Sequence, residues 1–92
     1  MKKDSEFLMV NAATKALEYK NKNPMALEEE IIRYVMNSLE VKSEKKIIGI
    51  ASATEVLKIK KMSKNSTDKE IMQMFMNNLP KLSASLRELD KD

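Results

Sequence analysis

Two stretches of the chain share one pattern of hydrophobic and polar positions. Residues 47–59 read IIGIASATEVLKI, and residues 7–19, forty positions earlier, read FLMVNAATKALEY. Aligned without gaps at this offset, residues 2–41 and 42–81 are identical at ten of forty positions, where about three are expected by chance. Any two amphipathic helices would match at hydrophobic positions, but polar matches such as Thr14/Thr54 and Asn37/Asn77 exceed that. We therefore expect an internal repeat.

The spacing of hydrophobic residues predicts two helical hairpins, with helices at about 4–21 and 24–41, and at about 44–62 and 67–79. We expect Asn23 to cap the second helix and Pro24 to occupy its first turn, where a missing N–H costs nothing. Ser43 can cap the third helix. Thr67 and Glu70 have the spacing of a capping box at the start of the fourth.

The third of these segments is ambiguous when taken alone. Ile47, Ile48 and Ile50 are β-branched and would suit a strand. The segment forty residues earlier is rich in Ala, Leu, Lys and Glu, which favours a helix, and the repeat extends that prediction to residues 44–62. Its hydrophobic residues cover nearly the whole circumference of a helical wheel, which is typical of a centrally packed helix.

The hydrophobic stripe of the fourth helix continues beyond Pro80. Leu82, Leu86 and Leu89 follow it in the same phase. Either the helix is kinked at Pro80 or a short further helix begins near Ser83. We expect a short carboxy-terminal helical extension at about 81–90.

Together these elements predict an all-α single domain over residues 1–92, a four-helix bundle built from two duplicated helical hairpins with that extension. The alternative is a pair of stacked hairpins, as in a helical solenoid. Solenoids usually need three or more repeats, so this alternative predicts a dimer.

Composition restricts the chemistry that the chain can carry. The 92 residues include no Cys and no His, which excludes disulfides, thiolate nucleophiles and imidazole ligands. Glu28, Glu29 and Glu30 are consecutive, so on a helix they point in three directions and do not form a metal site. We expect no enzyme activity, no cofactor and no metal. With no long uninterrupted hydrophobic run, we also expect no membrane partner and a cytoplasmic location.

The most suggestive feature is an excess of hydrophobic surface, which favours a protein partner. Eight methionines make the hydrophobic faces adaptable. On the helical wheel, Met74 lies opposite the inward face and is expected to be exposed, while Met76 points inward. We predict a non-catalytic helical protein-interaction module that self-associates as a homodimer. The candidate interface residues are Met74, Leu82, Leu86 and Leu89.

The alternative function is nucleic-acid binding through a lysine-rich surface. A net charge of +3 is small for this, and no aromatic residues are interleaved with the lysines. The lysines can instead be compensated by Glu28–Glu30, Asp68 and Glu70 at neighbouring helix ends. The candidate nucleic-acid contacts are Lys42, Lys45, Lys46, Lys58, Lys60, Lys61 and Lys64.

Overall fold

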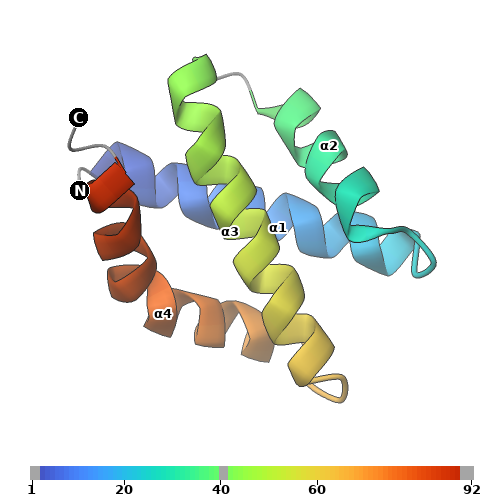
Figure 1. The fold of residues 1–92 in the computed structure, drawn as a ribbon. Helices are drawn as coiled ribbons and strands as arrows, with labels where there is room; N and C mark the ends of the chain where they lie inside the picture. Colours follow the sequence, from blue (N-terminus) through green and yellow to red (C-terminus); the bar gives the residue numbers. More distant parts are fainter. Residues whose placement is uncertain (1–2, 40–41, 90–92) are drawn as a thin grey trace.

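The computed structural model describes residues 3–39 and 42–89, and within these ranges all regular structure is helical. The helices are α1 (Lys3–Lys22), α2 (Glu28–Ser38), α3 (Ser43–Met62) and α4 (Asp68–Leu89) (Figure 1). The prediction of an all-α fold with four packed helices is confirmed, and the described part contains no strand at 47–59. No helix in this part of the chain has the length and hydrophobicity needed to cross a membrane.

Helices α1 and α3 form the centre of the molecule. They make the most extensive helix–helix contact, and each also contacts both α2 and α4. Helices α2 and α4 flank this pair, and their described residues do not contact each other. In Figure 1, α1 and α3 run in clearly different directions and cross. The prediction that the third helix is centrally packed is confirmed.

Small residues allow the two central helices to pack closely. Ala12, Ala13 and Ala16 of α1 and Ala53 of α3 are completely buried. A small side chain lets two helix backbones approach, and larger residues then fill the space around the crossing. The larger buried residues are Leu8, Met9, Leu17, Ile31, Val35, Leu39, Ile48, Val56, Ile59, Ile71, Phe75, Leu79 and Leu86.

Helix boundaries and turns recur at an offset of forty residues. Helices α1 and α3 begin and end forty residues apart, and α2 and α4 begin forty residues apart. Three backbone hydrogen bonds of the first turn have counterparts in the second at the same offset. They are Asn23 N–H to Tyr19 O with Ser63 N–H to Ile59 O, Ala26 N–H to Asn23 O with Ser66 N–H to Ser63 O, and Ile31 N–H to Leu27 O with Ile71 N–H to Thr67 O.

The start of the second helix differs from the prediction. Helix α2 begins at Glu28, not at Pro24, and its N-cap residue is Leu27, which makes no side-chain capping bond. Asn23 instead closes α1, because its backbone N–H and its side-chain amide both donate to Tyr19 O, at 2.9 and 3.2 Å. Glu28–Glu30 occupy the first turn of α2, where negative charge stabilises the helix N-terminus.

The starts of the later helices match the sequence more closely. Lys42, not Ser43, is the N-cap residue of α3, a shift of one residue. The capping box of α4 is confirmed: Thr67 N–H donates to Glu70 Oε1 at 2.8 Å, and Glu70 N–H donates to Thr67 Oγ1 at 3.2 Å. These bonds lower the pKa of Glu70, first through the backbone N–H of Thr67 and then through its side chain.

The segment after Pro80 continues α4 to Leu89, so the described residues include no separate fifth helix. Figure 1 shows α4 changing direction along its length, as expected where proline removes an N–H donor and crowds the preceding turn. After this bend, Ser83 and Leu86 are buried, and Ser83 Oγ donates to Met9 Sδ at 3.8 Å. The predicted extension to residue 90 ends outside the described residues.

Candidate functional site

A cleft of about 640 Å³ lies between the end of α1, the start of α2 and the carboxy-terminal half of α3. Its apolar lining comes from Ala26, Leu27 and Ile31 on one side and from Leu57 of α3 on the other. Ile31 is buried, whereas Leu27 is 71% exposed at the mouth. The cleft therefore offers an apolar surface to a ligand, in the size range of ordinary binding sites.

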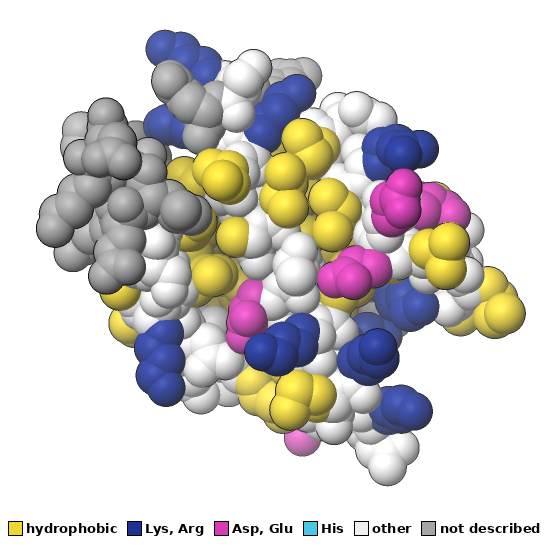
Figure 2. Space-filling view, in the orientation of Figure 1, with side chains coloured by type: hydrophobic (Ala, Val, Ile, Leu, Met, Phe, Trp, Pro, Cys, Tyr) yellow, Lys and Arg dark blue, Asp and Glu magenta, His cyan; other side chains and the backbone are white. Residues whose placement is uncertain are grey.

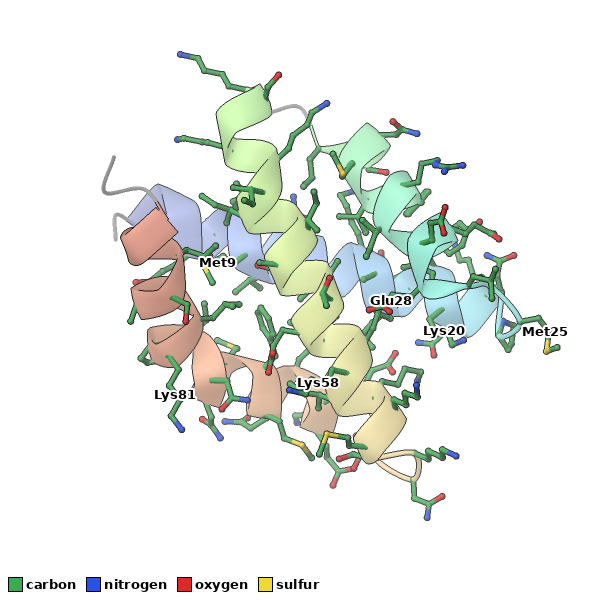
Figure 3. The ribbon with its side chains drawn as sticks, in the orientation of Figure 1. Met9, Lys20, Met25, Glu28, Lys58 and Lys81 are labelled. Atoms are coloured by element: carbon green, nitrogen blue, oxygen red, sulfur yellow. The ribbon has the colours of Figure 1, made fainter. Side chains whose placement is uncertain are left out.

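Five lysines, one glutamate and Thr54 complete the lining. Lys20 of α1, Glu28 of α2 and Lys58 of α3 approach this part of the molecule from three helices (Figure 3). The five lysines and the glutamate together carry a formal charge of +4, against +3 for the whole chain. Positive charge is therefore dense at the cleft, and most of it comes from Lys58, Lys60, Lys61 and Lys64 at the end of α3.

Two of these lysines have defined partners. Lys20 Nζ donates to Pro24 O at 2.8 Å and to Ala26 O at 3.3 Å, which holds the α1–α2 turn. Lys60 Nζ lies 3.8 Å from Asp68 Oδ1. Among the described residues, Lys58, Lys61 and Lys64 form no ion pair and no side-chain hydrogen bond, so their ammonium groups are available to an anionic ligand.

The predicted compensation of the lysines is only partial. Of the three consecutive glutamates, Glu28 faces the cleft, whereas Glu29 pairs with Arg33 at 3.6 Å and Glu30 accepts the Tyr19 hydroxyl at 2.5 Å. The bond to Glu30 also raises the pKa of Tyr19. Consecutive helical residues point in different directions, so one carboxylate of the run can reach the lysines.

The seven lysines considered from the sequence divide between the two ends of α3. Lys58, Lys60, Lys61 and Lys64 all line the cleft. Lys42, Lys45 and Lys46 belong to the amino-terminal end of α3 and do not line it. Figure 2 shows Lys and Arg side chains gathered near both ends of this helix.

Lys20 and Leu27 also line the cleft, and neither was predicted as a site residue from the sequence. Lys20 is identical to Lys60 at the forty-residue offset, and this identity was a usable signal. Leu27 gave none, because its exposure follows from the late start of α2.

The predicted hydrophobic interface residues have different positions in the folded chain. Met74 is half-buried against the core, and Ser63 Oγ donates to its sulfur at 3.7 Å. The prediction that Met74 is exposed is therefore wrong, because the α3–α4 turn covers this face of α4. Met76, expected to point inward, is 51% exposed.

The other three candidates belong to the segment after Pro80. Leu82 is half-buried against the core, and Leu86 is only 4% exposed. The side chain of Leu89 lies outside the described residues. Hydrophobic side chains that are freely exposed occur elsewhere, with Met25 at 92%, Met62 at 76% and Phe7 at 66%.

The described residues contain no group of three acidic, His or Cys side chains placed to hold a metal ion. What the cleft offers chemically is an apolar wall and positive charge, which suit binding. Searches with protein-family models, among curated proteins and among solved structures found no match to this chain.

Proposed function

We propose that this chain is a non-catalytic helical protein-interaction module that binds its partner at the cleft between α1, α2 and α3. The observation that carries the proposal is the combination of an apolar lining with three lysines that have no described partner. Protein partners use apolar anchors for affinity and charge for orientation. Two of the most exposed hydrophobic residues, Met25 and Met62, stand in or next to the turns at this end.

The proposal includes an evolutionary origin for the fold. Residues 2–41 and 42–81 represent one helical hairpin copied in tandem, with residues after Pro80 added to the second copy. Support comes from the ten identities, the shared helix boundaries and the repeated turn hydrogen bonds at one offset. In this view α1 and α3 are equivalent helices that pack on each other, which gives the molecule an internal pseudo-twofold arrangement.

The homodimer expected from the sequence stays a proposal, but Leu86 is not available for it in the folded chain. A dimer would use exposed residues such as Phe7 and Ile47, which are equivalent at the forty-residue offset and are 66% and 48% exposed. Sedimentation velocity over a wide range of concentrations tests this. A mass that rises with concentration supports self-association, and a monomer at every concentration removes it.

A second candidate function is nucleic-acid binding, which the lysines of the cleft favour. The nearby aromatic rings do not support it. Tyr19 and Tyr34 lie with ring centroids 4.6 Å apart, and the Tyr19 hydroxyl is bonded to Glu30. A carboxylate at this position would repel phosphates, and each ring already has one face against the other ring.

Selection of peptides against the folded protein tests the proposed function. The chain is immobilised and offered a displayed library of random helical peptides, with a helical protein of similar charge as the control target. Enrichment of peptides that bind the chain and not the control supports an interaction module, whatever their composition. Failure to enrich any peptide, together with a monomeric sedimentation profile, would overturn the proposal.

A further inference from the structure

The forty-residue offset supplies an internal comparison for the cleft. Lys20 and Glu28, which line it, correspond to Lys60 and Asp68. Ile31, on its floor, corresponds to Ile71, and both isoleucines are buried. The surrounding helix boundaries and turn hydrogen bonds also correspond. The end of α3 and the start of α4 therefore form a second region with the same backbone arrangement as the end of α1 and the start of α2.

In this second region, at the end of α3 and the start of α4, the chain's own side chains bond to one another. Asp68 accepts a hydrogen bond from the side-chain amide of Asn21, and Lys60 lies 3.8 Å from the same carboxylate. At the cleft, the residue corresponding to Asn21 is Lys61, and Glu28 makes no such bond among the described residues. The region at Asp68 is thus closed by bonds within the chain, whereas the corresponding region at Glu28 is the open cleft.

The difference in charge is concentrated in three positions. Lys58, Lys61 and Lys64 line the cleft, and the corresponding residues of the first half are Glu18, Asn21 and Pro24. The first half forms the same helix ends and the same turn with these three residues. The fold therefore does not require lysine there. Positive side chains generally stabilise a helix C-terminus. Helix α1 nevertheless ends at the position equivalent to the end of α3, with Glu18 in its penultimate turn where α3 has Lys58.

Grouped lysines without partners repel one another, and an anion that binds between them removes this electrostatic repulsion. We infer that the cleft between α1, α2 and α3 binds an acidic amphipathic helical segment of a partner protein. This inference rests on the proposed function and specifies the chemistry of its partner. Hydrophobic residues of the segment pack on Ala26, Leu27 and Leu57, and its carboxylates meet Lys58, Lys61 and Lys64.

The apolar lining is the reason for preferring an acidic helix to nucleic acid. A phosphate backbone has no apolar face to place against Leu27, which is 71% exposed. None of the residues that line the cleft is aromatic, so bases have nothing to stack on. An amphipathic helix presents hydrophobic and charged faces together, and proteins bind such helices by placing the hydrophobic face in an apolar groove.

The test measures binding of fluorescein-labelled probes by fluorescence anisotropy. The main probe is a designed helical peptide with leucine along one face and glutamate along the other, and its control replaces every glutamate with glutamine. Duplex DNA is the third probe. The test variant is Lys58→Glu/Lys61→Asn, which places the residues of the first half in the cleft. The matched variant, Lys42→Asn/Lys45→Glu, makes the same change in charge at the opposite end of α3.

We expect the wild-type chain to bind the acidic peptide more tightly than the glutamine peptide or the DNA. Loss of the cleft lysines should weaken binding of the acidic peptide by about tenfold or more, because two ion pairs are lost and one lysine is replaced by a carboxylate that repels the peptide. The matched variant should change it by less than about threefold. Circular dichroism of each variant establishes that it is folded.

Three results would overturn the inference. If both double variants lose the same amount of acidic-peptide binding, the effect comes from the overall charge of the protein and not from the cleft. Tighter binding of DNA than of the acidic peptide identifies the other class of partner. Absence of acidic-peptide binding, with selected peptides that are neutral or basic, overturns the inference but leaves the interaction module standing, so the two failures can be distinguished.

Discussion

Leu39 packs its Cδ1 methyl against Gly49, so closely that a Cβ added at Gly49 would lie 2.6 Å from it. This contact joins the end of α2 to the first half of α3, and Leu39 is 6% exposed. The glycine is needed for space, because its backbone is helical and its φ is ordinary.

We expect Gly49→Ala to lower the free energy of unfolding by about 1 kcal/mol. Displacing the buried Leu39 side chain costs about 1–3 kcal/mol, and the gain in helix propensity offsets about 1 kcal/mol of this. Urea denaturation followed by circular dichroism measures the change. In the background of Leu39→Ala, which removes the crowding, Gly49→Ala should instead stabilise by about 1 kcal/mol. An equal effect in both backgrounds would contradict the proposed contact.

Leu86 should behave as a core residue of its own chain. We expect Leu86→Ala to cost about 2–4 kcal/mol, because it removes a side chain that is 4% exposed and leaves a cavity. The loss should be independent of protein concentration. A loss that appears only at concentrations where the chain associates would assign Leu86 to an interface. Met76→Ala is the control on the same helix, and its effect should stay within about 0.5 kcal/mol because Met76 is 51% exposed.

The capping box of α4 should make a pH-dependent contribution to stability. The bonds from Thr67 lower the pKa of Glu70 in the folded chain. A lowered folded-state pKa stabilises the protein at pH values above the pKa of the unfolded chain, and this stabilisation is lost as the pH falls through the folded-state pKa. Wild type and Glu70→Gln should therefore differ by a constant amount near neutrality and converge below about pH 4.3.

Urea denaturation of both proteins over a series of acidic pH values measures this convergence. Thr67→Ala, which removes the hydroxyl that accepts the Glu70 N–H, should cost about 1 kcal/mol near neutrality. A difference between wild type and Glu70→Gln that widens on acidification would contradict the capping interaction.

Removing the cleft lysines should leave stability intact. We expect the free energy of unfolding of Lys58→Glu/Lys61→Asn to lie within about 0.5 kcal/mol of the wild-type value. A small increase is also consistent, because both lysines are exposed and lie in a cluster of like charge. Urea denaturation at low and at high salt checks this, and the difference should shrink as salt screens the cluster. A loss of several kcal/mol would mean that these lysines support the fold, which removes the reason for assigning them to a partner.

The sequence was most informative where the structural signal is local. The capping box at Thr67 and Glu70 was predicted correctly because its two bonds link residues three apart. The prediction for Asn23 and Pro24 was wrong for a related reason. Asn23 can cap a following helix or close a preceding one, and the choice depends on whether the chain can turn at Pro24 and Met25. Local preference does not decide between these two outcomes.

The candidate site was predictable only in part. The lysines at the end of α3 stood out as a cluster, but their relation to Lys20 and Leu27 depends on how the first hairpin packs against α3. Met74 was misplaced because a helical wheel describes one helix and omits the turn that covers it.

The sequence by itself determined the helical class, the order and approximate positions of the four helices, and the similarity of the two halves, because hydrophobic spacing and capping act over a few residues. Only the tertiary structure decided that α1 and α3 cross at the centre, that α4 bends back to bury Leu86, and that one end of the molecule is left open and positively charged. These features depend on contacts between residues far apart in the chain, where packing of side-chain volumes sets the outcome.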